Sequence, residues 1–407
     1  MKHVKAIGAT FLLWAVAGVA AAAPVWVGSW GASPVTPAPA RGPFPATPSY
    51  SNRTIREVVR LSIGGDRIRL RLTNKYGHAP LKIGAVSVAK ADASGNIVAG
   101  TERTVTFGGA RSTTIPAGAP LVSDPIDMSV ANLGSLSVSL YLPGDTGPCT
   151  CHQVGRQTAY VSAPGNFTGR AFKPAKTMTS RAFLSGVEVR TSAPAHAVVA
   201  FGDSITDGVG STVGANHRWP DLLADRLAAH KDAWGVVNAG ISGNQVLRAG
   251  AGESALARFD RDVLSVPGVA AVIVFEGIND IGIRLGHSRF GAPAKNDSKL
   301  TAASLIAGLQ QLIYRAHSKG LKIYGATITP YKGAAYYSDA GEVVRRKVNQ
   351  WIRTSGAFDA VLDFDALWRD PKHPDQIRDS LQAGDHLHGS DAGYRVLSNS
   401  IDLKLFQ

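Results

Sequence analysis

The chain has 407 residues, more than one typical domain, and its length suggests two domains. Apolar residues make up 44% and charged residues 18% of the sequence, a balance that excludes an intrinsically disordered chain. The formal net charge of +13 favours acidic surfaces such as anionic polysaccharide, lipid headgroups or nucleic acid. The positive residues are scattered rather than clustered, so we expect a solvated surface and no nucleic-acid partner.

The N-terminal stretch MKHVKAIGATFLLWAVAGVAAAAPVW has lysines first, then an apolar run, then small residues. This layout is typical of a secretory signal peptide, with cleavage after Ala22 in the small-x-small context set by Ala20. No other stretch approaches the roughly 20 apolar residues that a transmembrane helix needs. The sequence therefore predicts a signal peptide over residues 1–22, a secreted or periplasmic protein, and no stable membrane insertion.

Residues 23–195 show short alternating apolar and polar runs between turn residues, and this rhythm predicts an antiparallel β-sandwich-like domain. A proline-rich extended strap at 33–49 precedes it, and strands are expected within 81–92, 101–109 and 133–144. The segment TIREVVRLSIGGDRIRLRLTN, residues 54–74, predicts a hairpin. Its second strand carries an arginine row on the face opposite its apolar residues. That row is either a stripe for acidic ligands or a structural feature of a wet strand face. The row consists of Arg67, Arg69 and Arg71.

The two cysteines, Cys149 and Cys151, lie in the stretch GPCTCHQ. They can be oxidised in an exported chain, but a bond across one intervening residue closes a small ring and stabilises little. His152 adjoins them, yet three ligands within four consecutive residues is poor spacing for zinc, so we expect no metal. The two alternatives are a strained disulfide and two free thiols.

In residues 196–407, apolar strand-like runs alternate with helical patterns in five βα units. A parallel sheet wrapped by helices is the natural architecture for this order, and near-continuous apolar strands fit a sheet covered on both faces. The strands are expected at HAVVAFGDS, GVVNAGISGN, VAAVIVFEGIND, LKIYGATITP and DAVLDFDAL, with a last helix from SDAGYRVLSNSI.

Polar residues follow three of these strands, where the active residues of an open parallel sheet gather. Ser204 follows the first strand and is the candidate nucleophile, although a lone serine there is more often a helix N-cap. Gly243 follows the second strand and Asn279 the third. The main-chain N–H groups of Ser204 and Gly243, with the carboxamide of Asn279, are the candidate oxyanion hole.

Asp385 and His388 precede the last helix and are three residues apart. On a tight turn the carboxylate can hold one imidazole nitrogen while the other faces Ser204, which predicts a Ser-His-Asp triad. His386 competes for the role of base, but its place directly after Asp385 favours a structural or substrate-lining role. The glycine-rich stretch at 207–214 misses the spacing of a dinucleotide fingerprint and predicts a mobile loop.

The blocks GDSITDG, ISGN, GIND and DHLH, in this order, resemble the four signature blocks of the SGNH hydrolases, also called GDSL esterases/lipases, of the secreted bacterial two-domain type. The resemblance covers roughly 197–407. It implies a flavodoxin-like three-layer α/β/α domain, ester hydrolysis by a Ser-His-Asp triad, and no cofactor. The site residues it implies are Ser204, Gly243, Asn279, His388 and Asp385.

The sequence thus predicts a secreted serine esterase that hydrolyses carboxylic esters through an acyl-enzyme. Short acyl groups on carbohydrate, acetyl above all, are the expected substrate, because export, a β-rich companion domain and basic charge suit acidic sugars. A short-chain lipid or aryl esterase is the alternative. A carbohydrate-binding protein with a vestigial hydrolase domain is more distant, because decay should have broken the five-residue set. The acyl length, the alcohol partner and the oligomeric state stay open.

Overall fold

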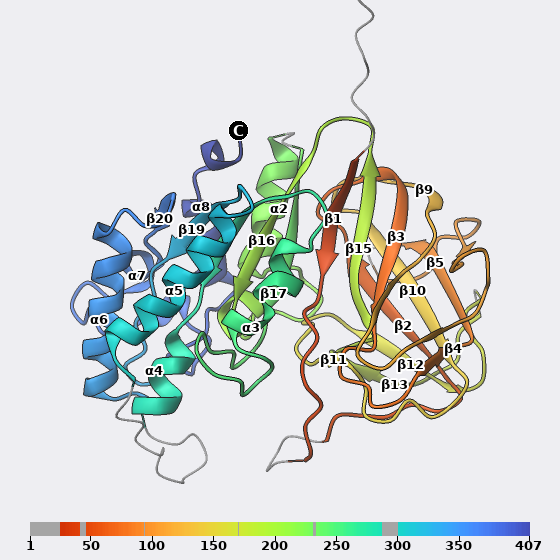
Figure 1. Cartoon of the computed structure of the whole chain (residues 1–407), viewed down its shortest axis with the longest axis horizontal. Coiled ribbons are helices and arrows are strands. Elements are labelled where there is room, and N and C mark those ends of the chain that lie inside the picture. The colour runs from red at the N-terminus through yellow and green to blue at the C-terminus, as the bar shows by residue number, and fades with distance from the viewer. Residues whose placement is uncertain (1–24, 41–45, 93, 170, 231–232, 287–299) are drawn as a thin grey trace, which may run out of the picture.

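The computed structural model describes residues 25–40, 46–92, 94–169, 171–230, 233–286 and 300–407. Over these ranges the chain forms an antiparallel β half and an α/β half, which lie side by side (Figure 1). The signal peptide predicted over 1–22 lies outside the described residues. In the part of the chain that the structure describes, no helix has the length and apolar character needed to cross a membrane.

The β half consists of two principal antiparallel sheets with their apolar residues between them, as the alternating pattern predicts. One sheet has the order β1-β15-β3-β8, with β9 also paired to β3, and the other has the order β13-β12-β2-β10-β5-β6. Two small sheets, β4-β7 and β11-β14, complete this half. The strands are β1 (Val25–Gly31), β2 (Arg53–Arg60), β3 (Gly65–Thr73), β4 (Leu81–Ile83), β5 (Ala85–Ala91), β6 (Arg103–Thr104), β7 (Thr113–Ile115), β8 (Pro120–Val122), β9 (Ile126–Val130), β10 (Ser135–Leu142), β11 (Cys151–His152), β12 (Ala159–Pro164), β13 (Pro174–Met178), β14 (Arg181–Ala182) and β15 (Leu184–Thr191).

The hairpin predicted over 54–74 is wrong. Strand β2 pairs with β10 and β12, whereas β3 pairs with β15, β8 and β9, so the two strands belong to different sheets. The chain crosses between the sheets at Gly64, where a Cβ atom would lie 2.3 Å from the carbonyl oxygen of Val130. Consecutive strands that face each other across a core show the same apolar alternation as strands that pair, so the pattern alone does not separate the two cases.

The arginine row of β3 is engaged by neighbouring strands. Arg69 and Arg71 both reach the buried carboxylate of Glu188 on β15, and Arg67 pairs with Asp127 on β9. The guanidinium of Arg69 also lies 4.3 Å from the ring centroid of Trp26 on β1. These contacts favour the structural interpretation of the row over a stripe for acidic ligands.

The α/β half is built on a parallel sheet of order β17-β16-β18-β19-β20. This is the flavodoxin-like order 2-1-3-4-5, so the fold class expected for the second half is confirmed. The strands are β16 (His196–Gly202), β17 (Trp234–Gly240), β18 (Val269–Phe275), β19 (Lys322–Ala326) and β20 (Ala360–Leu362). The helices are α1 (Ser204–Asp207), α2 (Trp219–Ala229), α3 (Ala255–Phe259), the π-helix η1 (Asp260–Leu264), α4 (Ile278–Leu285), α5 (Ala302–His317), α6 (Asp339–Thr354), α7 (Phe364–Trp368), α8 (Asp391–Ser400) and the 3₁₀ helices η2 (Asp379–Leu381) and η3 (Leu403–Phe406).

The two halves meet where β1 and β17 pack together, each at the edge of its own sheet (Figure 1). The approach is close enough that a Cβ atom at Gly235 would lie 2.2 Å from the carbonyl oxygen of Gly28. The main-chain N–H of Val236 donates to the hydroxyl of Ser62 at 2.8 Å. Each half therefore covers an edge strand of the other, which removes two exposed sheet edges.

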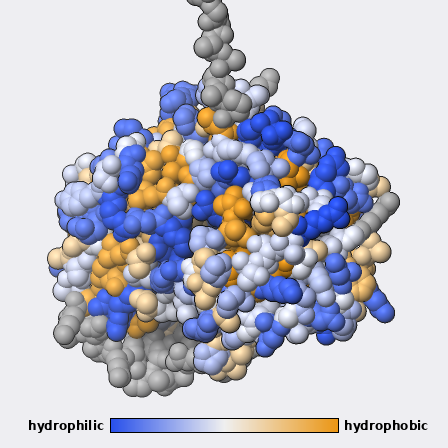
Figure 2. Space-filling model, turned by 45° about the vertical axis from the view of Figure 1, so that its right-hand side comes forward, coloured by the Kyte–Doolittle hydropathy of each residue, from blue (hydrophilic) through white to orange (hydrophobic). Residues whose placement is uncertain are grey.

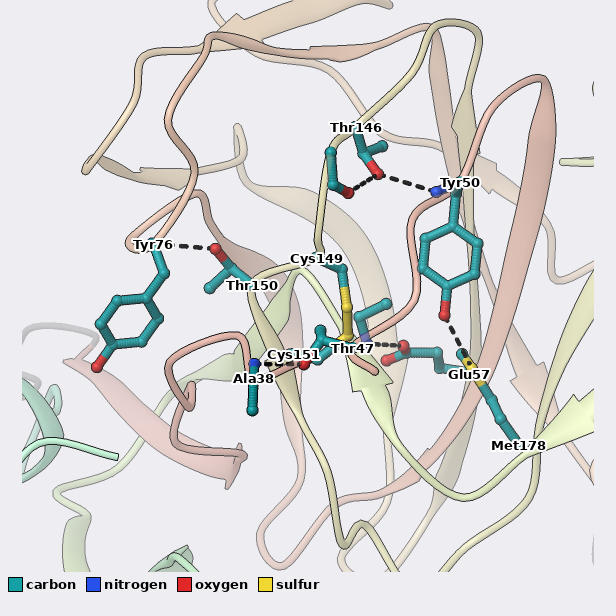
Figure 3. The surroundings of a disulfide bond; sticks show 12 residues. Ala38, Thr47, Tyr50, Glu57, Tyr76, Thr146, Cys149, Thr150, Cys151 and Met178 are labelled. Carbon is teal, nitrogen blue, oxygen red and sulfur yellow. Dashed lines mark hydrogen bonds between the residues drawn. A yellow bond between two sulfur atoms is a disulfide. The ribbon is translucent and has the colours of Figure 1, made fainter. Parts of the chain in front are cut away.

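Cys149 and Cys151 form a disulfide, so of the two alternatives left open by the sequence the free thiols are excluded (Figure 3). Both cysteines are buried, and Figure 3 shows the bond close to Tyr50 and Glu57. The carbonyl of Cys151 accepts a hydrogen bond from the N–H of Val35 at 2.8 Å, which ties the proline-rich strap to the β half. Among the described residues, no group of three or more His, Cys, Asp or Glu side chains is placed to hold a metal ion.

Apolar residues are dispersed over the surface. On the face that Figure 2 shows, apolar residues form separate patches between hydrophilic ones. The large apolar side chains with the greatest exposure include Tyr314, Val343 and Ile283, which lie on three different helices. Single apolar residues of this kind are normal on a protein surface.

Candidate active site

Ser204 lies at the carboxyl edge of the sheet, where β16 ends and the short helix α1 begins. The turn is fixed by Asp203, whose Oδ1 accepts the N–H of Ile205 at 2.9 Å. It also needs a residue without a side chain at position 202. A Cβ atom on Gly202 would lie 2.1 Å from Thr206 Oγ1 and 2.6 Å from the carbonyl oxygen of Phe275. The local sequence thus holds the serine hydroxyl in a tight turn between strand and helix.

The structure brings Ser204, His388 and Asp385 together. Nε2 of His388 lies 2.8 Å from Oγ of Ser204, and Nδ1 lies 2.5 Å from Oδ2 of Asp385. Oδ1 of Asp385 accepts the N–H groups of Leu387 and His388 at 3.1 and 2.9 Å. A carboxylate on Nδ1 selects the tautomer whose Nε2 is free to accept the serine proton, which is the arrangement that a general base requires.

Asp385 stays ionised in this arrangement. Burial raises the pKa of its carboxyl group, but the hydrogen bond and charge of His388 and the two main-chain donors lower that pKa well below its usual range. A carboxylate that keeps its charge can stabilise the imidazolium that forms when His388 takes a proton.

His386 does not join this relay. Its backbone has a left-handed φ of 57°, and its N–H donates to Oε1 of Gln382 at 3.1 Å. Its ring lies against the main chain at Gly333, where a Cβ atom would come within 2.7 Å of the ring. The left-handed turn at His386 places its ring against Gly333 and outside the contact between Asp385 and His388. This placement agrees with a structural role for His386.

Asn279 lies in the first turn of helix α4, directly after β18 and Gly277. Its side chain is buried, and Oδ1 accepts the hydroxyl of Tyr336 at 3.3 Å. Within the described residues its Nδ2 has no hydrogen-bond partner. A buried donor without a partner costs roughly 1–3 kcal/mol, so Nδ2 is available to an acceptor from outside the described residues.

Gly243 lies on the loop after β17 and has a left-handed φ of 82°, which favours glycine. The residue before it is tied down, because both the N–H and the hydroxyl of Ser242 donate to Oδ2 of Asp207, at 3.1 and 2.7 Å. Asp207 belongs to α1, the helix that starts with Ser204. The turn that carries Ser204 and the loop of Gly243 are therefore joined by side-chain contacts.

A buried arginine that no sequence motif singled out connects the ends of two strands to the loop of Gly243. Arg258, on α3, donates to the carbonyl oxygens of Gly202 and Ala239 at 2.9 and 2.7 Å and to Oδ1 of Asn244 at 2.9 Å. It thereby ties the ends of β16 and β17 to the loop of Gly243. No sequence signal marks it beyond its place on a helix whose neighbours are apolar.

Acidic groups surround Arg258 beneath the site. Its Nη2 lies 3.2 Å from Glu276, and Asp203 lies close enough for the charges to interact. Burial raises the pKa of Asp203 to about 7 and that of Asp280 to about 6, and it raises the pKa of Glu276 well above its usual value. The negative charge of Asp203 adds to the increase at Glu276, and the charges of Asp280 and Asp207 add to the increase at Asp203. Shifted carboxyl groups of this kind gather at functional sites.

A family model described as the GDSL-like lipase/acylhydrolase family matches residues 200–396. This span includes the relay, the Gly243 loop and Asn279. Residues 200–396 belong to the GDSL-like lipase/acylhydrolase family. The resemblance of the four sequence blocks to GDSL esterases and lipases is thereby confirmed. No curated protein matches the chain.

Solved structures similar to this GDSL domain include a lipase/acylhydrolase from Enterococcus faecalis, with 23% identity and a TM-score of 0.37, covering 50% of this chain and 92% of that one. A member of the lipolytic protein G-D-S-L family from Veillonella parvula has 21% identity and a TM-score of 0.37, covering 51% and 96%. AlAXEase, an acetyl xylan esterase, has 21% identity and a TM-score of 0.37, covering 50% and 96%.

Proposed function

We propose that this chain is a serine esterase that hydrolyses carboxylic esters through an acyl-enzyme. The observation that carries the proposal is the relay from Asp385 through His388 to Ser204, with the Nδ2 of Asn279, which has no partner among the described residues, in the same half of the chain. The relay supplies an activated nucleophile, and the amide supplies a donor for developing negative charge. Membership of the GDSL-like lipase/acylhydrolase family supports the same class of reaction.

The reaction has two stages, acylation of Ser204 and hydrolysis of the acyl-enzyme. Nε2 of His388 takes the hydroxyl proton while Oγ of Ser204 bonds to the ester carbonyl carbon, and the resulting oxyanion receives hydrogen bonds from the N–H groups of Ser204 and Gly243 and from Nδ2 of Asn279. His388 then gives its proton to the departing alcohol, and the carbon–oxygen bond to that alcohol breaks. A water molecule, activated by His388, hydrolyses the acyl-enzyme and releases the acid and the free serine.

The variant Ser204→Ala tests this function. Its kcat on p-nitrophenyl acetate should fall on the order of 10⁴-fold or more, because the nucleophile is lost while other groups of the site remain. Thermal unfolding of the variant should match that of the wild type. The control is Ser318→Ala, which removes an exposed hydroxyl at the end of α5 and should leave kcat unchanged. Full activity of Ser204→Ala would end the proposal.

We infer that the natural substrates are short acyl esters, acetyl above all, on carbohydrate. The net charge of +13 suits acidic sugars, and the β half packs directly against the half that carries the site. A cleft of about 420 Å³ lies between the halves, with Trp30, Arg71 and Lys75 among its lining residues. It is separate from the relay, and it is the kind of surface that could hold the remainder of a large substrate.

An activity panel tests the substrate class. Acetate release from acetylated glycans is compared with turnover of p-nitrophenyl esters of increasing acyl length. We expect the glycans to be deacetylated and kcat/KM to fall as the acyl chain lengthens. A rise of kcat/KM with acyl length, without acetate release from glycans, would favour the alternative of a short-chain lipid or aryl esterase and would overturn the carbohydrate assignment.

We further propose that the protein is exported to the periplasm or the medium. The leader-like N-terminal sequence supports this. N-terminal sequencing of the mature chain should begin at Ala23, and a mature chain that retains Met1 would contradict export by cleavage.

A further inference from the structure

His152 connects the β half to the catalytic half of the chain. It belongs to β11, beside the disulfide, and its side chain is only 6% exposed. Nδ1 lies 2.9 Å from the carbonyl oxygen of Ser33, also in the β half. Nε2 lies 3.0 Å from Oδ1 of Asp207 in the α/β half and 3.2 Å from the carbonyl oxygen of Val154.

These contacts define the charge of the imidazole. The carbonyl oxygens of Ser33 and Val154 can only accept hydrogen bonds, so both ring nitrogens of His152 must carry hydrogen. The ring is therefore an imidazolium, and its partner Asp207 is a carboxylate. Burial lowers the pKa of His152, but the charge and hydrogen bond of Asp207 and the two carbonyls outweigh burial and raise it.

Asp207 links His152 to the loop of Gly243 through hydrogen bonds. It is 1% exposed and lies three residues after Ser204 on the same short helix. One carboxylate oxygen faces His152, and the other accepts both the N–H and the hydroxyl of Ser242. Ser242 directly precedes Gly243, whose N–H is a proposed oxyanion donor. A chain of hydrogen bonds thus runs from the β half to the peptide group that carries this donor.

Other charged groups face the same pair. Arg181 lies opposite His152 in the β11–β14 ladder, and Glu57 on β2 interacts with both. From the α/β half, Arg218 interacts with the charge of Asp207. Burial raises the pKa of Glu57 to about 7 and lowers that of Arg181 to about 10. Among these charged groups, Asp207 is the one that the structure places in direct hydrogen bond with the imidazole of His152. The pair of His152 and Asp207 therefore sets the orientation of the Asp207 carboxylate.

We propose that His152 is a positioning residue for ester hydrolysis: as a buried cation of the β half, it orients Asp207 so that Ser242 and the oxyanion donor of Gly243 are held in place. The proposal rests on the proposed esterase function. It makes the β half part of the catalytic machinery rather than an accessory. Since an oxyanion donor acts on the transition state, loss of this support should lower kcat and leave KM nearly unchanged.

The test uses the full chain and p-nitrophenyl acetate. His152→Gln keeps a hydrogen-bond donor but removes the charge, and Ser242→Ala removes the hydroxyl at the other end of the chain of contacts. Each should lower kcat about 10- to 100-fold, below the roughly 10²–10³-fold cost of removing one oxyanion donor outright. The kcat of the double variant should be no lower than that of the slower single variant, because the two substitutions interrupt the same chain of hydrogen bonds.

The matched control is Arg60→Gln. Arg60 in the β half pairs with Asp225 on α2 at 2.5 Å, so this variant also removes an ion pair between the halves but none that leads to Ser242. Its kcat should stay within twofold of the wild type. An equal loss of kcat in Arg60→Gln would show a general effect of the interface and would overturn the proposal.

The pH profile separates positioning from simple structural support. The wild type should lose kcat on the alkaline side as His152 gives up its proton, and His152→Gln, which has no such proton, should lack that decline. Unchanged kcat in His152→Gln, or an unchanged alkaline decline, overturns the proposal. If His152→Gln does not fold, Ser242→Ala decides alone, and wild-type kcat in that variant overturns the proposal. A wild type without esterase activity would instead defeat the proposed function.

Discussion

Asn279 has a buried amide donor for which the proposed function supplies a partner. The hydroxyl of Tyr336 occupies its Oδ1, while its buried Nδ2 has no hydrogen-bond partner within the described ranges. Leaving this buried donor unpaired costs roughly 1–3 kcal/mol in the free energy of folding. In the proposed mechanism such a donor is fixed before the reaction, so it need not reorganise when negative charge develops on the substrate.

Asn279→Ala should therefore lower kcat by roughly 10²–10³-fold, with only a small change in KM. The measurement is steady-state kinetics on p-nitrophenyl acetate, with Asn96→Ala on the exposed surface of the β half as the control. A raised KM at unchanged kcat would assign Asn279 to substrate binding instead.

Because the pKa of Asp203 is raised, we expect the stability of the protein to depend on pH. Burial raises its pKa to about 7 in the folded protein, whereas an unfolded carboxyl group titrates near pH 4. As the pH rises from about 4 to about 7, the unfolded chain gives up this proton first, so this group makes folding progressively less favourable across that window. Asp203→Asn can keep the hydrogen bond to Ile205 without the charge. Its melting temperature relative to the wild type should rise between pH 5 and pH 8, and a pH-independent difference would contradict this.

At the scale of the elements, the long strands and helices follow from apolar periodicity, but the short elements that carry the site do not. Helix α1 has four residues, too few for a helical pattern, and α4 starts at Ile278, within the stretch VAAVIVFEGIND in which the third strand is expected. Both begin where a strand of the sheet ends, and glycine permits the turn in each case. The local geometry of the site therefore depends on Gly202, whose missing Cβ atom makes room for Thr206 and the carbonyl of Phe275, and on Gly277, whose left-handed φ of 118° favours glycine.

Gly202→Ala tests that dependence. The added Cβ would lie 2.1 Å from Thr206 Oγ1 and 2.6 Å from a backbone carbonyl, so the turn must shift. We expect a loss of about 1–3 kcal/mol in the free energy of unfolding and a lower kcat, because Ser204 moves with the turn. Gly144→Ala, where the added atom meets nothing within 4 Å, is the control. Unchanged urea unfolding of Gly202→Ala would contradict the close packing.

For the whole molecule, the close approach of β1 to β17 makes the two halves one structural unit. Each covers an edge strand of the other, and side chains such as Arg60 and His152 cross the boundary to bind Asp225 and Asp207. The segment that joins the halves, 192–194, is exposed. Proteolysis there should thus report how firmly the halves stay together.

Gly235→Ala should loosen that unit. Its added Cβ would lie 2.2 Å from the backbone oxygen of Gly28, so the halves must separate slightly. We expect faster cleavage at 192–194 by a broad-specificity protease and a lower melting temperature than in the wild type. Gly169→Ala, with open space around the added atom, should show neither change. Equal cleavage rates in the two variants would argue against a tightly packed interface.

The sequence by itself determined the order of the long strands and helices and the candidate residues Ser204, Gly243, Asn279, Asp385 and His388, because periodicity and short motifs are local properties of a chain. Tertiary structure alone decided that β2 and β3 lie in different sheets, that Arg258 ties the site loops together, and that His152 reaches Asp207. Those features join residues far apart in the chain. Whether two such residues meet depends on how whole sheets pack, and no local pattern of side chains encodes that contact.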